Sequence, residues 1–271
     1  MILPVLLWYN FNMEKAEATK IDEEDFALII PAYNEEESIG ILISEIRSIY
    51  PDIEIIVISD GSTDNTAKIA YESGVTVLDL PCNLGVGGAV QTGMRYAVEL
   101  GYETVVRIDG DGQHNPGEIS RLLRAMKISG ADFVTGSRFL NHGDVQGSTK
   151  MRRIGNILLA CFLSLICRKR ITDPTSGFWC TRGKLLKYFS LYYPSEYPEP
   201  EALALLRRQG YDMIEEAIDV RPRKYGVSSI NSLGTIYFAM RVSLALMADR
   251  VRPVDRRYAK FGDERRLKNA T

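Results

Sequence analysis

Val106-Arg-Ile-Asp-Gly-Asp-Gly-Gln-His114 is the stretch around which the rest of the chain is organised. An apolar segment runs into Asp109 and Asp111, and the glycines beside them add little bulk. Carboxylates at positions i and i+2 at the end of a strand point to the same side, so both can face one cation. Oxygen ligands suit Mg²⁺ or Mn²⁺, which such sites commonly share with the phosphates of a substrate. The alternative is a polar turn, because Asp-Gly pairs are common turn formers.

The composition sets limits on the class of protein. A chain of 271 residues has room for one large α/β domain or two smaller ones. The net charge is −2, and neither a zinc finger nor an aromatic-basic RNA signature is present, so we expect no nucleic-acid partner. The four cysteines lack any CxxC spacing, which argues against zinc and redox motifs. We expect reduced thiols in a cytoplasmic protein.

Short apolar runs alternate with helical patterns from residue 26 onward. The runs predict strands at 26–30, 53–59, 75–80, 104–108 and 132–136, with helices between them. The first of these helices should have a broad apolar face made of Ile39, Ile41, Leu42, Ile43 and Ile46. Asp64 is the expected N-cap of the helix that ends at Tyr71. The pattern predicts a mostly parallel sheet with helices on both faces, in which a ligand binds at the carboxyl ends of the strands. This rule brings residues 31–35, 60–64, 85–88 and 109–113 to one rim.

These stretches, taken together, resemble a known family. They are Ile29-Ile-Pro-Ala-Tyr-Asn-Glu-Glu36, Ser59-Asp-Gly-Ser-Thr-Asp-Asn-Thr66, Asn83-Leu-Gly-Val-Gly-Gly-Ala-Val-Gln-Thr-Gly93, Asp109-Gly-Asp-Gly-Gln-His114 and Gly136-Ser-Arg-Phe139. In this order they are similar to the inverting, nucleotide-sugar-dependent glycosyltransferases of family 2. The resemblance implies the GT-A fold, a Rossmann-like α/β sheet.

The resemblance also implies roles for individual residues. Asp109, Asp111 and Gln113 would bind Mg²⁺ or Mn²⁺ on the donor diphosphate, whose departure builds negative charge. The nucleotide-sugar site would comprise Pro31, Tyr33, Glu35, Asp60, Gly85, Gly88, Gly110, Arg138 and Ser228. Helix capping is the alternative role for Asp60 and Asp64.

After residue 140 the alternation of strands and helices ends. An apolar core, 154–167, lies between the basic clusters 150–153 and 168–170. It is too short to span a bilayer, so it is either a buried helix or one that lies in a membrane interface. Residues 236–248 form a second apolar stretch before a basic tail, with the same two interpretations. We therefore expect a protein peripheral on the inner face of the membrane, which a membrane-protein partner could assist.

The second half resembles the acceptor half of dolichol- or polyprenyl-phosphate sugar synthases. The matching stretches are Thr172-Asp-Pro-Thr-Ser-Gly-Phe178, Tyr197-Pro-Glu-Pro-Glu-Ala-Leu203 and residues 218–230. The match implies that Arg223 and Ser228 lie on a loop that closes over the diphosphate. The expected acceptor-binding residues are Arg152, Arg153, Asp173 and Ser176. Two features depart from the pattern: Ser229 replaces a common basic residue, and the apolar spanning tail of many relatives is missing.

Three functions remain open on the sequence. The first is metal-dependent, inverting transfer of a sugar to polyprenyl phosphate, whose anionic oxygen needs no general base. The second is transfer to a hydroxyl of a lipid-linked saccharide, which needs a carboxylate base, with Glu199 and Glu201 as candidates. The third is a non-catalytic nucleotide-sugar-binding subunit. For catalysis we expect Asp109, Asp111, Glu201 and Arg223.

The expected organisation has three parts. Residues 1–24 form an N-terminal tail, whose apolar start is too short to span a bilayer. Residues 25–235 form the glycosyltransferase domain, with a nucleotide-sugar half at 25–140 and an acceptor half at 141–235. Residues 236–271 form an apolar helix and a basic tail.

Overall fold

The computed structural model describes residues 25–140, 150–221, 241–242, 258 and 260, without the side chains of 150–152. Seven strands are seen there: β1 Phe26–Ala32, β2 Glu54–Ser59, β3 Thr76–Asp79, β4 Thr104–Arg107, β5 Phe133–Ser137, β6 Trp179–Arg182 and β7 Met213–Ala217. The helices are α2 Ile39–Ile49, α3 Thr66–Glu72, α4 Gly85–Glu99, α5 Ile119–Ser129, α6 Lys150–Cys167, α7 Gly183–Tyr192 and α8 Pro198–Arg208.

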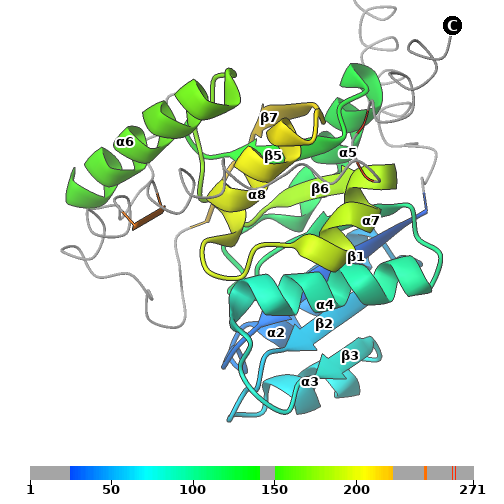
Figure 1. The fold of residues 1–271 in the computed structure, drawn as a ribbon. Helices are drawn as coiled ribbons and strands as arrows, with labels where there is room; N and C mark the ends of the chain where they lie inside the picture. The colour runs from blue at the N-terminus through cyan, green and yellow to red at the C-terminus, as the bar shows by residue number, and fades with distance from the viewer. Residues whose placement is uncertain (1–24, 141–149, 222–240, 243–257, 259, 261–271) are drawn as a thin grey trace, which may run out of the picture.

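The strands form one sheet in the order β3-β2-β1-β4-β6-β5-β7 (Figure 1). Every pair of neighbours is parallel except those that include β6, which runs antiparallel to β4 and to β5. The predicted α/β class with a mostly parallel sheet is confirmed. The five strands predicted before residue 140 are present within one or two residues of the expected bounds.

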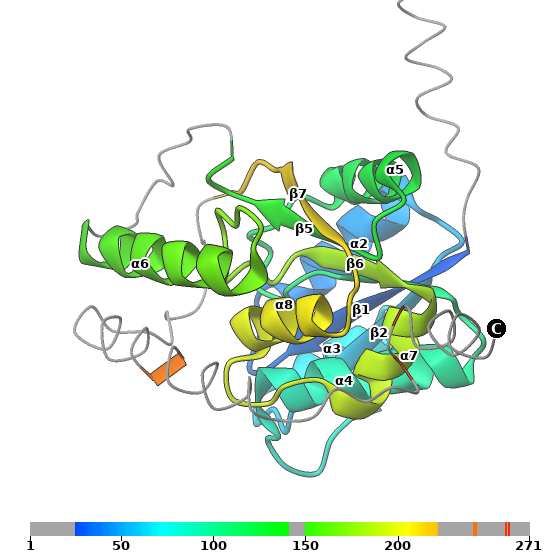
Figure 2. The same cartoon turned by 45° about the horizontal axis from the view of Figure 1, so that its top comes forward.

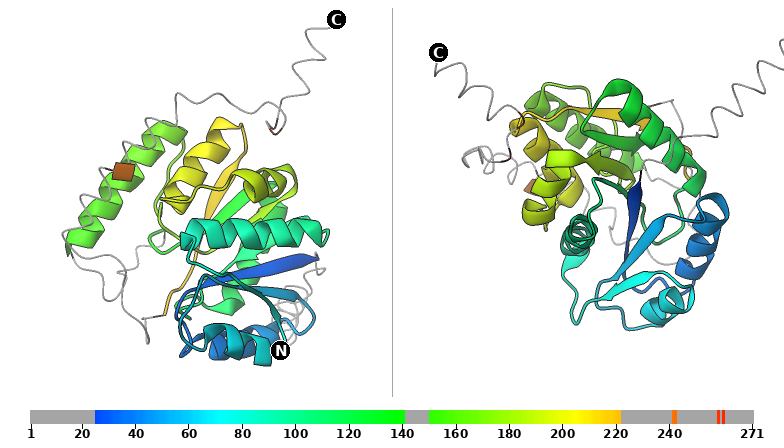
Figure 3. Two further views of the ribbon diagram at one scale, coloured as in Figure 1. Left: turned by 60° about the horizontal axis from the view of Figure 1, so that its bottom comes forward. Right: turned by 90° about the vertical axis from the view of Figure 1, so that its right-hand side faces the viewer.

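Helices cover both faces of the sheet, as the apolar runs predict (Figure 3). Side chains of a strand alternate between the two faces. In β1, Ala27 and Ile29 accordingly join one core with α4, α6, α7 and α8, whereas Leu28 and Ile30 join a second core with α2, α3 and α5. These β1 side chains are fully buried.

The expectation that the alternation of strands and helices ends after residue 140 is wrong, because two strands follow among helices α6, α7 and α8. β6 inserts between β4 and β5, and β7 pairs with β5 at the edge of the sheet. β6 has only four residues and β7 carries two glutamates, so neither shows the apolar run of a buried strand. Charged residues are usual in edge strands, where one side of the backbone is unpaired. The donor half and the acceptor half of the chain therefore contribute to a single sheet.

Two local predictions also need correction. The N-cap of α3 is Asn65 rather than Asp64, although Asp64 Oδ1 does accept the backbone N–H of Thr66 at 2.9 Å. Ile41, expected on the apolar face of α2, is 53% exposed. All four cysteines are free, as expected.

The apolar run 154–167 is helical and extends from the body of the sheet (Figure 2). It is buried on one side only: Leu159 and Leu163 are buried against the core, and Ile157 and Leu165 are exposed. The second apolar stretch, 236–248, lies outside the described residues apart from Arg241 and Val242.

Candidate active site

Two loops at the carboxyl ends of β1 and β2 are tied to each other. Asn34 Oδ1 accepts the backbone N–H of Thr63 at 2.8 Å, and Glu36 Oε2 accepts that of Asn65 at 3.0 Å. The backbone N–H of Glu36 in turn donates to Asp64 Oδ2 at 3.1 Å. We call these two segments, 34–36 and 63–66, the loop clasp. It fixes the rim on which the predicted nucleotide residues lie.

Tyr33, which follows β1, and Asp60, which follows β2, differ in their exposure to solvent. Asp60 is only 4% exposed, and its Oδ1 accepts the backbone N–H of Leu84 at 2.7 Å, just before α4. Asp60 is not the N-cap of a helix, because the N-caps of α3 and α4 are Asn65 and Leu84. Tyr33 is 49% exposed, so its ring is available to a ligand. At the start of α4, Gly85 adopts a φ of +79°, which side chains rarely permit.

The Asp-Gly-Asp turn is packed onto the end of β1. A Cβ at Gly110 would lie 3.2 Å from the carbonyl oxygen of Pro31, so the glycine allows the close approach. Ser38 Oγ donates to the Gly110 carbonyl at 2.8 Å and to Glu35 Oε2 at 3.0 Å. The turn and the predicted residues Pro31 and Glu35 therefore form one assembly.

Arg107, on the last position of β4, joins this turn to the second half of the chain. The residue is 1% exposed. Its Nη2 donates to Asp109 Oδ1 at 2.8 Å and its Nη1 donates to Glu199 Oε1 at 2.7 Å. The guanidinium also lies 5.9 Å from the ring centre of Trp179, its partner on β6. A planar fork with fixed donors suits such double pairing.

The environment of Asp109 holds its carboxylate in the charged form. Burial alone would raise the pKa of Asp109, but the charge of Arg107 and contact with His114 bring it well below the ordinary value. His114 Nε2 lies 3.7 Å from Asp109 Oδ2, and the imidazole stacks on Phe178. On another side, a Cβ at Gly177 would overlap the Asp109 carboxylate, so only glycine fits there.

A second arginine–carboxylate pair joins residues that the sequence assigned to opposite substrates. Arg138 donates from Nε to Asp173 Oδ2 at 2.6 Å and from Nη2 to Asp173 Oδ1 at 2.7 Å. Its backbone N–H also donates to Asp173 Oδ2 at 3.1 Å. Asp173 is 1% exposed. The bidentate geometry fixes the loop after β5 against the segment before β6.

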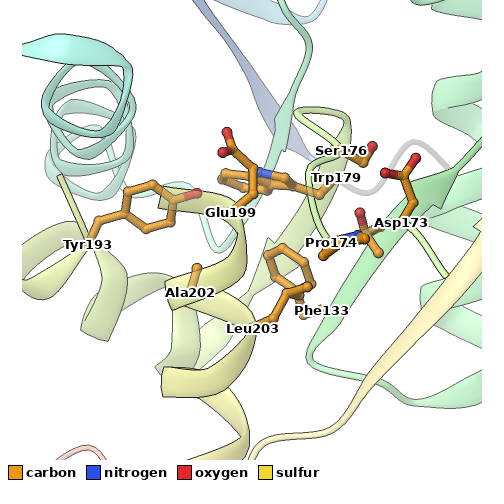
Figure 4. Close-up of a pocket in the computed structure, with 10 residues that line it drawn as sticks. Phe133, Asp173, Pro174, Ser176, Trp179, Tyr193, Glu199, Ala202 and Leu203 are labelled. Atoms are coloured by element: carbon orange, nitrogen blue, oxygen red, sulfur yellow. The ribbon is translucent and has the colours of Figure 1, made fainter. Parts of the chain in front are cut away.

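A small pocket lies between these two pairs. Figure 4 shows Glu199 and Tyr193 on one side of it and Asp173 and Ser176 on the other. The indole N–H of Trp179 is buried at this pocket and has no hydrogen-bond partner within the part of the chain that the structure describes. The buried Tyr193 hydroxyl lies against the guanidinium of Arg107.

The residues of the turn fit a divalent cation that a substrate also binds. Nowhere in the described ranges do three or more His, Cys, Asp or Glu side chains gather as a metal cluster. Asp109 and Asp111 would supply one or two carboxylates, and the backbone N–H of Gln113 donates to Asp111 Oδ1 at 3.0 Å. Mg²⁺ typically binds through one or two carboxylates and substrate phosphates rather than through an all-protein cage.

Several predicted site residues lie away from the pocket or outside the described residues. Arg223 and Ser228 fall outside the described residues, as does the side chain of Arg152. Arg153 is exposed on α6. Glu201 is on α8 two residues from Glu199, and positions two apart on a helix face different directions. Glu199, rather than Glu201, lines the pocket.

The sequence did not lead us to expect Arg107 in the site. Its position inside an apolar strand could have indicated it, because a buried arginine needs paired carboxylates. Its partner Glu199, 92 residues away, had no such signal.

Comparison with known proteins agrees with this geometry. Residues 27–191 match the family described as Glycosyl transferase family 2. The chain belongs to glycosyl transferase family 2. As a member of this family it is a glycosyltransferase with the GT-A fold.

Two relatives have names that refer to dolichyl phosphate or to polyprenol monophosphomannose. The UDP-N-acetylglucosamine–dolichyl-phosphate N-acetylglucosaminyltransferase of Methanococcus voltae is 30% identical over 220 residues, 74% of this chain and 87% of the relative. The polyprenol monophosphomannose synthase of Mycolicibacterium smegmatis is 29% identical over 213 residues, 75% of this chain and 80% of the relative.

A solved structure gives the same fold. Glucosyl-3-phosphoglycerate synthase from Mycobacterium tuberculosis, in complex with Mn²⁺, UDP-glucose and phosphoglyceric acid, is 25% identical with a TM-score of 0.62. The match covers 86% of this chain and 82% of the synthase.

Proposed function

We propose that this glycosyltransferase moves a sugar from a nucleoside-diphosphate sugar to a polyprenyl phosphate, with inversion at the anomeric carbon and with Mg²⁺ or Mn²⁺. The observation that carries the choice of acceptor is the pairing of the pocket carboxylates. Glu199 and Asp173 each accept from an arginine. A carboxylate already engaged by a guanidinium is poorly placed to take a proton from an acceptor hydroxyl. A phosphate oxygen is already anionic and needs no base.

The reaction is then a single displacement. The acceptor phosphate oxygen attacks the anomeric carbon, a new carbon–oxygen bond forms, and the bond to the diphosphate breaks. The electron pair leaves with the nucleoside diphosphate, whose charge a bound divalent cation would stabilise as a Lewis acid. Asp109, Asp111 and Gln113 would hold that cation, and Tyr33 and Asp60 would hold the nucleoside. Arg223 and Ser228 would bind the diphosphate.

The acceptor side rests on the second half of the chain. Arg152 and Arg153 would bind the lipid phosphate, for which arginine is well suited. Asp173 and Ser176, at the pocket, would orient it. The relatives from Methanococcus voltae and Mycolicibacterium smegmatis support a polyprenyl-phosphate acceptor.

We also propose that α6 docks on the cytoplasmic face of a membrane. None of the helices in the described ranges has the length and apolar character to cross a bilayer. The exposed apolar residues of α6 include Ile154, Ile157, Leu158 and Leu165. Exposed Arg153 and Arg168 stand at its two ends, where they can meet anionic headgroups. A membrane-protein partner that presents the lipid stays a prediction.

A transfer assay tests the acceptor. Labelled UDP-N-acetylglucosamine, UDP-glucose and GDP-mannose are each incubated with undecaprenyl or dolichyl phosphate and Mn²⁺. We expect one donor to give a labelled lipid whose sugar mild acid releases, and EDTA, Asp109→Asn or Asp111→Asn to abolish it. Asp52→Asn, an exposed acid remote from the rim, is the matched control and should retain activity. Transfer solely to a hydroxyl of a lipid-linked saccharide would overturn the proposal.

A further inference from the structure

Arg107 connects two acids that belong to different parts of the molecule. Asp109 follows β4 on the donor side, and Glu199 begins α8 on the acceptor side. Each occupies a different arm of the guanidinium, at 2.8 Å and 2.7 Å. The side chain of Arg107 is 2% exposed, that of Glu199 is 18% exposed and that of Asp109 is 33% exposed. The guanidinium and its contact with Glu199 are therefore enclosed, and water screens them little, whereas Asp109 stays open on one side.

We propose that Glu199 and Arg107 are positioning residues for Asp109: Glu199 holds the guanidinium in place and balances its charge, so that Asp109 remains able to bind a divalent cation. This inference rests on the cation site of the proposed function and not on the identity of the acceptor. Neither residue is required to touch the substrate.

Charge balance gives the first reason. One guanidinium faces two carboxylates, so each carboxylate neutralises part of its charge. If Glu199 lost its charge, the whole attraction of Arg107 would act on Asp109 and would compete with the cation. Removing one charge from such an enclosed site, at an effective dielectric constant of about 20, changes affinity on the order of tenfold.

Orientation gives the second reason. A guanidinium anchored at one arm alone can rotate, whereas an anchor on each arm fixes its plane. Arg107 Nη2 contacts Asp109 Oδ1, whereas His114 and Gly177 lie against the other side of the carboxylate, so the plane of the guanidinium helps to set the direction of Oδ1. The contact of Glu199 thus has a role separate from its charge.

Two variants separate charge from contact. Glu199→Gln keeps an oxygen that can accept from Arg107 but has no charge, whereas Glu199→Ala removes both. Glu196→Gln, an exposed acid three residues earlier, is the matched control. Mn²⁺ is titrated by calorimetry into each protein with saturating UDP, and in a parallel series with GDP. We expect both Glu199 variants to bind Mn²⁺ about tenfold more weakly than the wild type, and Glu196→Gln to bind it equally well.

Turnover at saturating Mn²⁺ separates the two roles. We expect Glu199→Gln to recover to within about threefold of the wild-type kcat, because its contact persists. Glu199→Ala should remain at least about tenfold slower, since extra Mn²⁺ cannot restore the orientation. Arg107→Lys keeps the charge but not the planar fork, so its kcat should also stay low at saturating Mn²⁺. Thermal unfolding of each variant without Mn²⁺ reports any change in folding.

The failures are distinguishable. Equal Mn²⁺ affinity for Glu199→Gln and the wild type, or full recovery of Glu199→Ala at saturating Mn²⁺, overturns the inference and leaves the acceptor proposal intact. Weakened Mn²⁺ binding in the Glu199 variants of an enzyme that makes no polyprenyl-phosphate product supports the inference and overturns the acceptor proposal. If Mn²⁺ does not bind the wild type in the presence of UDP or in the presence of GDP, the cation site and the inference both fail.

Discussion

Gly177 lies directly against the carboxylate of Asp109. A Cβ built there would overlap both carboxylate oxygens. The backbone φ of Gly177 is not in the left-handed region, so space alone excludes a side chain. The residue belongs to the segment before β6, which brings the acceptor half of the chain onto the acid that we propose binds the cation.

Gly177→Ala should therefore move Asp109 without breaking the backbone. We expect kcat/KM to fall at least about a hundredfold, because a shift on the order of 1 Å at a reacting centre has that effect. Stability should fall by about 1–3 kcal/mol, as overpacked sites do. Gly117→Ala is the control, since its Cβ would be 3.4 Å from Asn115 Oδ1 in ordinary contact. Unchanged kinetics in Gly177→Ala would contradict this account of the site.

At the scale of elements, the Asp64 carboxylate is one of the groups that hold the loop clasp together. Burial would raise the pKa of Asp64, but hydrogen bonds from the Thr66 hydroxyl and from the backbone of Thr66 and Glu36 bring it below 3.8. A carboxyl whose pKa is lower in the folded state stabilises the fold above its unfolded pKa. That stability is lost as the pH falls through the folded pKa.

Asp64→Asn removes the charge and keeps an acceptor oxygen. We expect the variant to be less stable than the wild type by about 1 kcal/mol at pH 7, because hydrogen bonds to a charged acceptor stabilise by about that much more than those to a neutral one. The difference should shrink below pH 3.8, where the wild-type carboxyl gains its proton. Urea unfolding from pH 7 to pH 2 measures it. Glu72→Gln, an exposed acid on α3, should show no such trend; a constant difference for Asp64→Asn would refute the assignment.

The helix α6 supplies a second prediction at this scale. Leu165 is 78% exposed on the side of α6 that we propose meets the membrane. Leu165→Glu should weaken sedimentation with anionic phospholipid vesicles at least about tenfold, because it removes buried apolar area and adds a repelled charge. The control is Ile128→Glu, which replaces an 80% exposed residue of α5. The helix α5 covers the other face of the sheet. Equal losses in both variants would argue against docking through α6.

At the scale of the whole molecule, both halves of the chain are needed for the sheet. Among the described strands β5 pairs with β6 and β7, and both follow residue 140. A fragment of residues 25–140 leaves β5 without a partner and exposes the apolar face that α7 and α8 cover. An unpaired strand and an uncovered core favour unfolding or aggregation.

We expect the fragment 25–140 to lack fixed tertiary structure, although it holds most of the donor motifs. Near-ultraviolet circular dichroism and thermal unfolding measure this directly. The full chain should show a cooperative transition under the same conditions. A cooperative transition in the fragment would mean that the donor half folds alone.

The sequence by itself determined the class of fold, the five strands before residue 140 and the rim that carries the acidic turn. It could do so because buried parallel strands leave continuous apolar runs, and because the carboxyl ends of such strands meet at one edge.

Only the tertiary structure decided which distant residues meet. Glu199 reaches Arg107 across 92 positions, and Asp173 reaches Arg138 across 35. Such contacts depend on how β6 inserts between β4 and β5, and a four-residue strand carries too little periodicity to reveal that insertion. The charge balance around Asp109 is accordingly a property of the folded molecule, because it arises where two halves of the chain close on one buried arginine.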